Sequence, residues 1–488
     1  MVMLSVIVLL ILTIYSGLLI RHRLKSMPSG TDYESSLYPV EPDDVLFLHD
    51  LRFKNDEGKT VFEEGIYSEI FQAIESARHS VLVDVFLYNS DHGKDKQSPQ
   101  HRTITRKLTD LLCVKGAQGL DVLLVTDEIN NFYGSYASPI LRRLQAHNVK
   151  TVITRLERLR DANPLYSAWY RLFIGWMPTG IGGIIKHPFG HPEQKITFPS
   201  LLRSLNFKAN HRKVVVVDSC LAFITSANPH DPSSLHSNIA FRIKGDIVKE
   251  VEYAEHAVAA FSGLKTGRFM QGPPDLQQTH PKKLRSGEDG KYQVRLLTEK
   301  KIKDHLFREI GKTAKDELIM MALLYLTDRQ VMKEIRDAAA RGVEIRIILD
   351  PSEHAFGLRK YGIPNKHASL DLYSDPHFGK NLNIKWYKTH GEQFHTKMAA
   401  FQRRDSFTVI GGSANFTSKN LDNYNLEMNL LVSTEADSKL CRDVGTYFDR
   451  LWFNKNGEYT LDYDLLKDES RLKYILYRVQ EGTGMCTY

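Results

Sequence analysis

One short polar pattern occurs twice in this chain with the same surroundings, and this duplication limits the possible folds more than any other feature. The two copies are His211-x-Lys213 and His395-x-Lys397, and each opens an apolar run of strand type. A Ser-x-Asn closes a second apolar run soon after each copy, formed by Ser226 with Asn228 and by Ser413 with Asn415. A pattern repeated with its context predicts a site assembled from two similar halves. Because alternate residues of a strand share one face, the four His and Lys side chains could together hold a phosphate.

The triplet His-x-Lys is a weak signal when it stands alone. A chain with 19 His residues should contain on the order of one or two such triplets by chance, and this chain contains four. The other two, His92 to Lys94 and His280 to Lys282, lie among Asp, Gly, Pro and Gln, with no strand and no Ser-x-Asn after them. We interpret these two as solvated loop residues.

Strand and helix patterns also repeat in the two halves. The expected order is strand, helix, strand, which predicts a βαβ unit with two parallel strands. The expected ranges are 80–88, 104–117 and 121–127 in the first half, and 317–325, 330–341 and 343–350 in the second. Gly119 and Gly342 end the two helices at matching places. An aromatic helical stretch then ends each half, at 248–261 and at 440–452.

The segment 271–290 breaks this periodicity with Gly, Pro and paired Gln residues, so it predicts a linker between two lobes. We therefore expect an α/β fold with a first lobe over residues 45–270 and a second lobe over residues 291–488. Two lobes that face each other would place the site in the cleft between them. Such sharing would also explain why neither half contains a complete site.

The first residues of the chain predict a membrane anchor. The segment from Val2 to Ile20 carries no charge and is about long enough to cross a hydrocarbon core as a helix. A basic cluster follows at once, formed by Arg21, His22, Arg23 and Lys25. A cleaved signal peptide would have positive charge before the apolar run and small residues after it, and neither is present. We expect a retained single-span anchor with its basic flank over residues 1–25, a polar tether over 26–44, and a catalytic part on the cytoplasmic side of the cell membrane.

Charge and cysteine content narrow the class of partner. Lys and Arg exceed Asp and Glu by 65 to 58, which suits anionic lipid headgroups and nucleic acid equally. The four cysteines are spread singly and have no metal-ligand spacing. Reduced thiols in a cytosol-facing domain explain them most simply. Since the chain also lacks a His-Glu-x-x-His or calcium-loop pattern, we expect neither metal nor cofactor.

An aromatic insertion at 166–199 has no counterpart in the second half. It is rich in glycine, poor in acidic residues, and contains Trp169, Tyr170, Phe173, Trp176, Phe189 and Phe198. One interpretation is a flap that enters the bilayer surface or lines an acyl-chain passage, since aromatic rings favour that interface. The alternative is an ordinary packed insertion between strands. The sequence leaves both open.

These motifs resemble those of the phospholipase D superfamily, whose mark is a duplicated His-x-Lys-x4-Asp followed by a Gly-Ser-x-Asn-like element. The first copy matches in full and includes Asp218. In the second copy Gln402 stands at the position of Asp218, and Asp405 comes three residues late, so either Asp405 fills this role or nothing does. A late acidic residue typical of the superfamily is present as Glu427. Aligning Asn238 with Asn425 places Ala240 at the equivalent position of the first half.

The resemblance implies two pseudo-symmetric lobes, each a mixed sheet flanked by helices, and a role for each motif residue. It implies that His211 is the nucleophile and His395 the acid, which is chemically reasonable because imidazole can serve as either near neutral pH. Phosphoryl transfer would then pass through a phosphohistidine. Lys213 and Lys397 would stabilise negative charge on the phosphate, and Asn228 and Asn415 would donate hydrogen bonds to it. Glu427 would orient one histidine. Asp218 would have a structural role, and Ser226 and Ser413 would support the loops or contact the phosphate.

Among the lipid-acting members of this superfamily, the chain most resembles bacterial cardiolipin synthases. The resemblance implies transfer of a phosphatidyl group from one phospholipid to the hydroxyl of another. Cardiolipin synthases often carry two N-terminal spans, whereas this sequence shows one. One alternative is a phospholipase D hydrolase. A second is a nuclease or other phosphodiesterase, since basic charge serves DNA equally well. A third is a membrane-anchored binding protein without activity. Nucleic acid is the less favoured partner.

Overall fold

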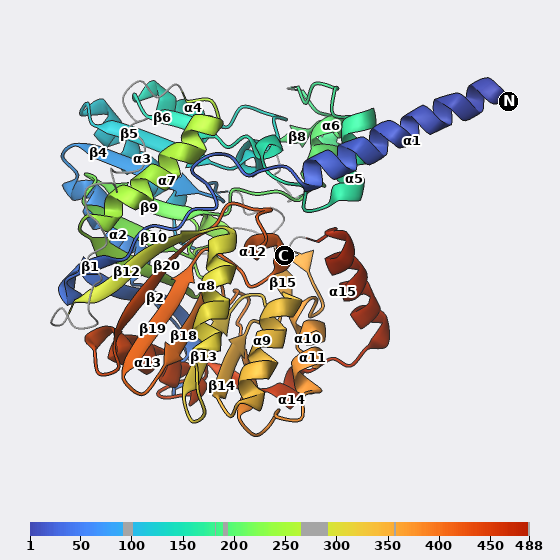
Figure 1. The fold of residues 1–488 in the computed structure, drawn as a ribbon. Coiled ribbons are helices and arrows are strands. Elements are labelled where there is room, and N and C mark those ends of the chain that lie inside the picture. The colour runs from blue at the N-terminus through green and yellow to red at the C-terminus, as the bar shows by residue number, and fades with distance from the viewer. Residues whose placement is uncertain (91–100, 181, 189–193, 265–290, 356–357, 487–488) are drawn as a thin grey trace.

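The structure is a computed structural model that describes residues 1–90, 101–180, 182–188, 194–264, 291–355 and 358–486. Two large mixed sheets are covered by helices, and a long N-terminal helix projects from the body (Figure 1). The predicted α/β architecture of two similar lobes is therefore confirmed. The triplets at 92–94 and 280–282, the expected linker 271–290 and Phe189 lie outside the described residues.

The first lobe is built on an eight-stranded sheet with the order β3-β2-β11-β10-β9-β4-β5-β6. Its strands are β2 (Val45–Lys54), β3 (Thr60–Glu63), β4 (Ser80–Val85), β5 (Asp121–Thr126), β6 (Lys150–Ile153), β9 (Lys213–Val217), β10 (Leu221–Thr225) and β11 (Asn238–Lys244). The strands β4, β5 and β6 run parallel, and α3 (Ile104–Ala117) connects β4 with β5 as predicted. One face is covered by α2 (Ile66–Ser76), α3 and α4 (Pro139–Ala146), and the other by α7 (Ile247–Phe261).

The second lobe repeats this arrangement in a nine-stranded sheet with the order β1-β12-β20-β19-β18-β13-β14-β17-β21. Its strands are β1 (Tyr38–Val40), β12 (Tyr292–Thr298), β13 (Leu318–Leu323), β14 (Glu344–Leu349), β17 (Leu382–Tyr387), β18 (Lys397–Gln402), β19 (Ser406–Gly412), β20 (Met428–Glu435) and β21 (Thr460–Asp462). The helix α9 (Arg329–Ala340) connects the parallel strands β13 and β14. It covers the outer face with α8 (Lys300–Gly311), while α13 (Lys439–Trp452) covers the inner face.

One hydrophobic core joins the two lobes. Buried side chains from the inner faces of both sheets and from α7 and α13 form a single cluster, which includes Val214, Phe241, Met398 and Val409. The sheets approach each other closely at Gly411, where a Cβ atom would lie 2.9 Å from Phe241 Cε2 and 3.0 Å from Ile239 Cδ1. Glycine is needed there because any side chain would have to displace packed core atoms. The lobes therefore form one continuous unit.

The expected tether is more structured than its composition indicates. Residues 38–40 form β1, which pairs antiparallel with β12 at the edge of the second-lobe sheet. The hydroxyls of Tyr33 and Tyr38 both donate to the Glu250 carboxylate on α7 of the first lobe. This segment therefore connects the two lobes as well as leading to the N-terminal helix.

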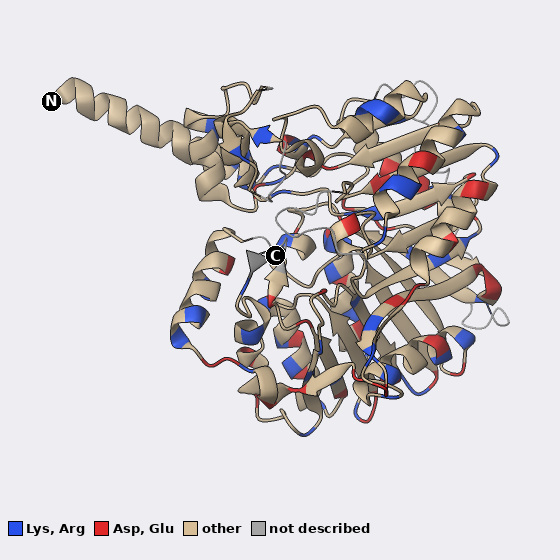
Figure 2. Cartoon of the chain, turned by 180° about the vertical axis from the view of Figure 1, so that it is seen from behind, with Lys and Arg blue, Asp and Glu red and all other residues tan. Residues whose placement is uncertain are grey.

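The helix α1 (Val2–Arg23) is the one helix among the described residues that is long and apolar enough to cross a membrane, with a mean hydropathy of 2.6. None of its residues is buried, and Figure 2 shows no charged residue along its projecting part. Its base packs against α5 (Pro164–Phe173) of the aromatic insertion, where the Tyr15 hydroxyl donates to the Leu165 carbonyl. This helix suggests membrane association.

The aromatic insertion contains α5, the short strands β7 (Ile185–Lys186) and β8 (Lys195–Ile196), and α6 (Phe198–Ser204). Tyr170 is buried, but most of the other described aromatic side chains are exposed, namely Trp169, Phe173, Trp176 and Phe198. An ordinary packed insertion would bury these rings, so their exposure favours the flap interpretation.

The remaining helices of the second lobe are short, except the last one. They are α10 (Asn365–Ala368), α11 (Leu370–Tyr373), α12 (Ser418–Leu421), α14 (Tyr463–Leu466) and α15 (Arg471–Thr483), and a small pair of strands, β15 (His354–Ala355) and β16 (Leu358–Arg359), lies near them in sequence. The helix α12 follows the second Ser-x-Asn directly. The helix α15 contacts α10 on the side of the molecule from which α1 projects (Figure 1).

Candidate active site

The two His-x-Lys motifs meet where the lobes join. Each histidine lies two residues before a central strand, His211 before β9 and His395 before β18. The backbone amide of His211 donates to the Leu426 carbonyl over 2.9 Å, and that of His395 donates to the Ser237 carbonyl over 2.8 Å. Each histidine is therefore tied through its backbone to a segment of the opposite lobe. This explains how a site can form from two half motifs far apart in sequence.

The side chain of each histidine is also held by the opposite lobe, but with different chemistry. His211 Nδ1 lies 2.9 Å from Glu427 Oε1, and His395 Nδ1 lies 3.0 Å from Asn238 Oδ1. In both contacts Nδ1 keeps its proton and donates it to the partner oxygen, which leaves Nε2 of each ring for chemistry. The partner of His211 is a carboxylate and that of His395 is a neutral amide.

The supporting contacts correct the alignment that places Ala240 opposite Glu427. The hydroxyl of Ser413 donates to the Glu427 carboxylate, and the hydroxyl of Ser226 donates to Asn238 Oδ1 over 3.0 Å. Asn238 is therefore the counterpart of Glu427. The alignment was two residues out of register because it matched two asparagines by identity. Ala240 lies further along β11, where it pairs with β10 in the core.

Burial makes the empty site unfavourable for positive charge. Burial lowers the pKa of Lys213 to about 7, although the nearby carboxylates of Glu427 and Asp84 raise it. Burial and the charge of Lys213 hold the pKa of Lys397 well below its ordinary value. Each amine donates to the carbonyl of its own motif histidine, over 2.6 Å for Lys213 and 2.7 Å for Lys397. The charge on each lysine makes protonation of the other less favourable, and a bound anion would stabilise the protonated form of both.

The two histidines share this electrostatic environment. Burial lowers the pKa of His211 to about 4, a shift that the Glu427 carboxylate opposes. Burial and the nearby Lys397 hold the pKa of His395 well below its ordinary value, and His236 and Lys213 act in the same direction. Both rings are therefore neutral in the empty site near pH 7. A negatively charged substrate would favour the protonated form of either ring.

The predicted serine and asparagine residues divide into two groups. The hydroxyls of Ser226 and Ser413 are used in the contacts to Asn238 and Glu427, so these serines support the partners of the histidines. Asn228 accepts from the Leu87 amide over 3.3 Å, and Asn415 Oδ1 is buried without a hydrogen-bond partner among the described residues. The amide groups of Asn228 and Asn415 remain candidates for substrate contact.

Asp218 does not belong to this cluster. It lies beyond the far end of β9, where its carboxylate accepts from the backbone amides of Arg78, His79 and Ser80 at 2.7 to 3.2 Å. Although burial raises its pKa, these hydrogen bonds lower it overall. Asp218 therefore holds the start of β4 against the end of β9.

The second lobe forms the equivalent corner differently. Gln402 and Asp405 are both exposed, and Asp405 does not take the place of Asp218. The carboxylate of Glu317, on the neighbouring chain segment before β13, instead accepts from the backbone amides of Arg404 and Ala314 at 3.2 and 2.8 Å. An acidic side chain thus holds this corner together in both lobes. In the first lobe it is Asp218, which follows β9, and in the second it is Glu317, which precedes β13.

Sequence reasoning missed a pair of buried acids that position the two motifs. The amide of Asn210 donates to Asp127 over 2.7 Å, and the amide of Phe394 donates to Asp350 over 2.8 Å. Burial raises the pKa of both carboxyls to about 7. A signal was present, because each of these aspartates directly follows the second strand of its βαβ unit.

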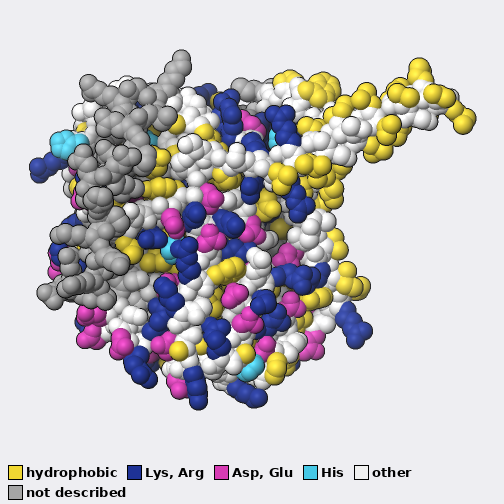
Figure 3. All heavy atoms as spheres, in the orientation of Figure 1, with side chains coloured by type: hydrophobic (Ala, Val, Ile, Leu, Met, Phe, Trp, Pro, Cys, Tyr) yellow, Lys and Arg dark blue, Asp and Glu magenta, His cyan; other side chains and the backbone are white. Residues whose placement is uncertain are grey.

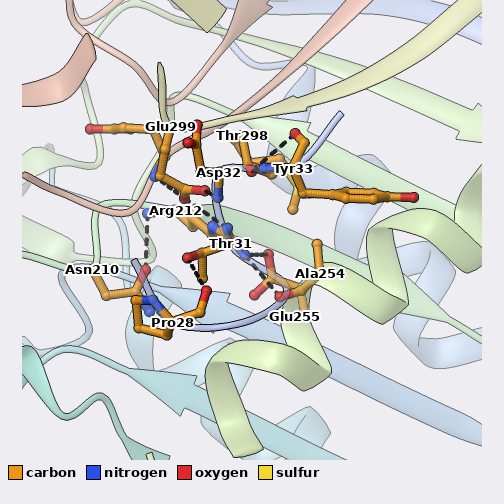
Figure 4. Close-up of polar contacts among 12 residues, drawn as sticks. Pro28, Thr31, Asp32, Tyr33, Asn210, Arg212, Ala254, Glu255, Thr298 and Glu299 are labelled. Atoms are coloured by element: carbon orange, nitrogen blue, oxygen red, sulfur yellow. Dashed lines mark hydrogen bonds and ion pairs between the residues drawn. The ribbon is translucent and has the colours of Figure 1, made fainter. Parts of the chain in front are cut away.

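The residue between His211 and Lys213 is the centre of a buried ionic cluster (Figure 4). The Arg212 guanidinium lies 2.7 Å from Glu299 Oε1 and 3.4 Å from Glu255 Oε1, and all three side chains are fully buried. Glu299 also accepts from the amide of Glu427 over 3.1 Å and from that of Asp32 over 2.6 Å. This carboxylate therefore links the first motif, the partner of His211 and the N-terminal segment.

Another missed residue is His236, whose ring centroid lies 5.9 Å from that of His395. Its Nδ1 accepts from the Gln393 amide over 3.1 Å, and burial lowers its pKa to about 3. Its carbonyl accepts from the side-chain amide of Asn238 over 2.9 Å, which fixes Oδ1 of Asn238 toward His395. Among the described residues no group of three His, Cys, Asp or Glu side chains could hold a metal ion.

Comparisons with known proteins find similarity in sequence and in fold. Residues 306–452 match a sequence family described as "Cardiolipin synthase, PLD-like domain". Cardiolipin synthase 1 of Bacillus anthracis is 23% identical over 325 residues, which cover 63% of this chain and 53% of that protein. Cardiolipin synthase 1 of Bacillus cereus is 22% identical over 402 residues, which cover 78% of this chain and 64% of that protein. The chain thus spans about half to two thirds of the length of these relatives.

A solved structure shares the whole fold. The crystal structure of phosphatidylserine synthase from Haemophilus influenzae superposes with a TM-score of 0.54 over 97% of both chains, at 12% identity. The duplicated motif, the shared fold and these matches make the chain similar to proteins of the phospholipase D superfamily. In sequence it is similar to bacterial cardiolipin synthases.

Proposed function

We propose that this protein is a membrane-anchored phosphatidyltransferase that moves a phosphatidyl group between phospholipids, as a cardiolipin synthase does. The proposal rests on the similarity to cardiolipin synthases, the apolar helix α1 and a site that favours an anion. The observation that carries it is the pairing of His211 with a carboxylate and of His395 with a neutral amide, because this difference suits the two histidines to different steps.

In the first step, Nε2 of His211 attacks phosphorus of the donor lipid. A P–N bond forms and the bond between phosphorus and the leaving alcohol oxygen breaks, while the imidazole of His211 gains positive charge. The Glu427 carboxylate at Nδ1 stabilises that charge, and it would also make the neutral ring a stronger nucleophile. A neutral amide at this position could not do so. This supports the assignment of His211 as the nucleophile.

His395 transfers the protons. Its protonated Nε2 gives a proton to the leaving alcohol, and the neutral ring then removes a proton from the hydroxyl of the acceptor lipid. The acceptor oxygen attacks phosphorus, and the P–N bond to His211 breaks. The amide oxygen of Asn238 keeps the Nδ1 proton in place through both steps without adding a charge. Protonation of His395 therefore depends on the negative charge of the bound phosphodiester.

Lys213 and Lys397 would bind the phosphate oxygens, with the amides of Asn228 and Asn415 as neutral donors. Negative charge increases on those oxygens as phosphorus becomes five-coordinate, so these donors stabilise the transition state more than the bound substrate. His211 and His395 are only 8% and 7% exposed. This enclosure would limit the access of water and favour transfer over hydrolysis.

The orientation in the membrane is part of the proposal. The basic residues that follow α1 favour a cytoplasmic location of the catalytic lobes, with α1 as a single span. Protease treatment of intact spheroplasts should leave a C-terminal tag protected, whereas permeabilised cells should lose it. Cleavage of the tag in intact spheroplasts would contradict this orientation.

An activity assay on the full chain tests the proposed reaction. Detergent-solubilised protein is incubated separately with phosphatidylglycerol and with single-stranded DNA. From phosphatidylglycerol we expect cardiolipin and free glycerol in equal amounts. Phosphatidic acid as the product would instead indicate a phospholipase D hydrolase. Cleavage of single-stranded DNA in place of lipid would indicate a nuclease, and no turnover of either substrate would indicate a binding protein.

Matched variants identify the site responsible for any activity found. His211→Ala and His395→Ala should each abolish turnover, because each removes one of the two reacting rings. His79→Ala is the control, since this histidine is exposed and lies at the distant corner capped by Asp218. Normal activity in either motif variant would refute the shared-site mechanism.

A further inference from the structure

The C-terminal helix α15 carries an apolar stripe that the fold leaves uncovered. Leu472, Ile475, Leu476 and Val479 follow the spacing of one helical face and are between 47% and 81% exposed. The opposite face contains the fully buried Tyr477, which packs against Leu324 and Tyr325 after β13. The helix is therefore fixed to the second lobe on one side and presents hydrophobic side chains to its surroundings on the other.

The C-terminal end of α15 lies beside the two elements already associated with the membrane. A hollow of about 160 Å³ is lined by residues from the base of α1, the start of α5 and the end of α15, represented by Arg23, Pro164 and Gly482. Figure 1 shows that α1 projects from the body on the side that carries α5 and α15. Figure 3 shows hydrophobic side chains along α1 and on the adjoining side of the body.

The exposed residues of the insertion continue the same kind of surface. Trp169, Phe173 and Trp176 are exposed on and just after α5. Aromatic rings of this kind favour the boundary between lipid headgroups and acyl chains. A helix that is packed on the body and exposes an apolar stripe favours the same depth, lying in the plane of the surface.

Charge indicates which lipids this surface would meet. Lys186 and Lys195 are both exposed and stand directly opposite each other in the β7–β8 pair. Like charges in that position destabilise a strand pair unless an anion lies nearby. Arg471, at the start of α15, is exposed as well. These basic groups suit a bilayer that contains anionic phospholipid.

We propose that α15 and the aromatic insertion form one membrane-contact surface that rests on an anionic bilayer beside α1. The apolar stripe of α15 enters the acyl-chain boundary, and the hollow among α1, α5 and α15 opens at the bilayer surface. The wall of that hollow includes Thr417 and Lys419, close in sequence to Asn415. The active site, which includes Asn415, would thus be held next to the lipids at the bilayer surface.

Site-specific labelling of the full chain in proteoliposomes tests this surface. Ile475→Cys is combined with Cys220→Ser and labelled with an environment-sensitive fluorophore. The matched control is the unaltered chain labelled at Cys220, an exposed cysteine in the turn between β9 and β10. In vesicles of phosphatidylcholine and phosphatidylglycerol, we expect the label at 475 to shift to shorter wavelength and to lose at least half its intensity when nitroxide-labelled lipids are present.

The control label at Cys220 should show neither change. Equal behaviour of the two labels would overturn the proposal. Self-quenching of the 475 label in detergent without lipid would also overturn it, because it would indicate that a second copy of the chain covers the stripe of α15. Equal quenching in vesicles of phosphatidylcholine alone would overturn the anionic preference. Val479→Cys with Cys220→Ser provides a second label position should Ile475→Cys fail to fold. Labelling measures lipid contact and not turnover, so its outcome is independent of the proposed activity.

Discussion

His211 and His395 are held by the opposite lobe through the same atom, Nδ1, but only His211 faces a carboxylate. Its partner Glu427 lies at 2.9 Å, whereas the partner of His395 is the amide oxygen of Asn238 at 3.0 Å. The two lobes are therefore equivalent in backbone geometry and different in charge. This difference is the physical basis for assigning the histidines different steps.

Replacing Glu427 with Gln should reduce kcat by about 100-fold or more, since one preorganised charge is lost where positive charge develops. The neutral side chain keeps the size of the native one, so KM should change little. Steady-state kinetics with phosphatidylglycerol would measure both constants. Unchanged kcat would show that the carboxylate has no role beyond packing.

Replacing Asn238 with Asp should raise the pKa of His395, because a carboxylate stabilises the protonated ring. The alkaline limb of the kcat profile should then move to higher pH, since His395 would stay protonated over a wider range. A pH profile of the variant beside the unaltered chain tests this. A profile that is unmoved, with normal folding by circular dichroism, would contradict the proton-transfer role of His395.

Binding of inorganic phosphate should take up protons at pH 8. Lys213, with a pKa of about 7, is mostly neutral in the empty site at that pH, and an anion beside it raises its pKa. Titration calorimetry in two buffers of different ionisation enthalpy gives the number of protons bound. Lys213→Met should reduce the uptake, and proton release by the unaltered chain would contradict this electrostatic picture.

Replacing Asp218 with Asn should affect stability and leave kcat unchanged. The loss should be about 1 kcal/mol, a modest value because the carboxylate is partly exposed. Because the folded-state pKa of Asp218 is lowered, its contribution is present above the unfolded-state pKa of about 3.9 and disappears as pH falls through the folded value. Denaturant unfolding at pH 7 and pH 3 measures this, and a large loss of kcat would place Asp218 in the mechanism after all.

Replacing Glu299 with Gln should destabilise the protein by about 3 kcal/mol or more, since it leaves Arg212 with reduced charge compensation in a fully buried position. It should also loosen the N-terminal segment, because Asp32 loses a charged acceptor. Hydrogen exchange of residues 28–40 measures the second effect. Glu252→Gln, a partly exposed carboxylate on α7, is the control, and equal effects of the two substitutions would contradict the role of the buried cluster.

The repeating order of elements was predictable from the sequence because local patterns determine it. The expected helices at 330–341 and 440–452 correspond to α9 at 329–340 and α13 at 439–452. Gly119 and Gly342 both have positive φ, as residues that end helices commonly do. The convergence of the two motifs followed from their duplication, since each half lacked partners that only the other could provide.

The contacts between lobes could not be predicted in the same way. Asn238 was misaligned because the position of a partner depends on strand register, which neighbouring strands determine. The role of Glu317 was hidden because the equivalent acid lies on a different segment in the first half. Likewise, β1 consists of three residues in a polar segment, and its pairing with β12 depends on the completed second-lobe sheet.

The central claim is that His211, and not His395, carries the phosphatidyl group. The variant His395→Asn retains the nucleophile but lacks both the acid of the first step and the base of the second. A phosphatidyl donor whose leaving group needs no proton, such as a p-nitrophenyl ester, should therefore load His211 and leave the intermediate unresolved. We expect mass spectrometry of this variant, after brief incubation with that donor and alkaline quenching, to locate a phosphatidyl group or its fragments on His211. A modification on His395 in the reciprocal variant His211→Asn, with none in His395→Asn, would contradict the account.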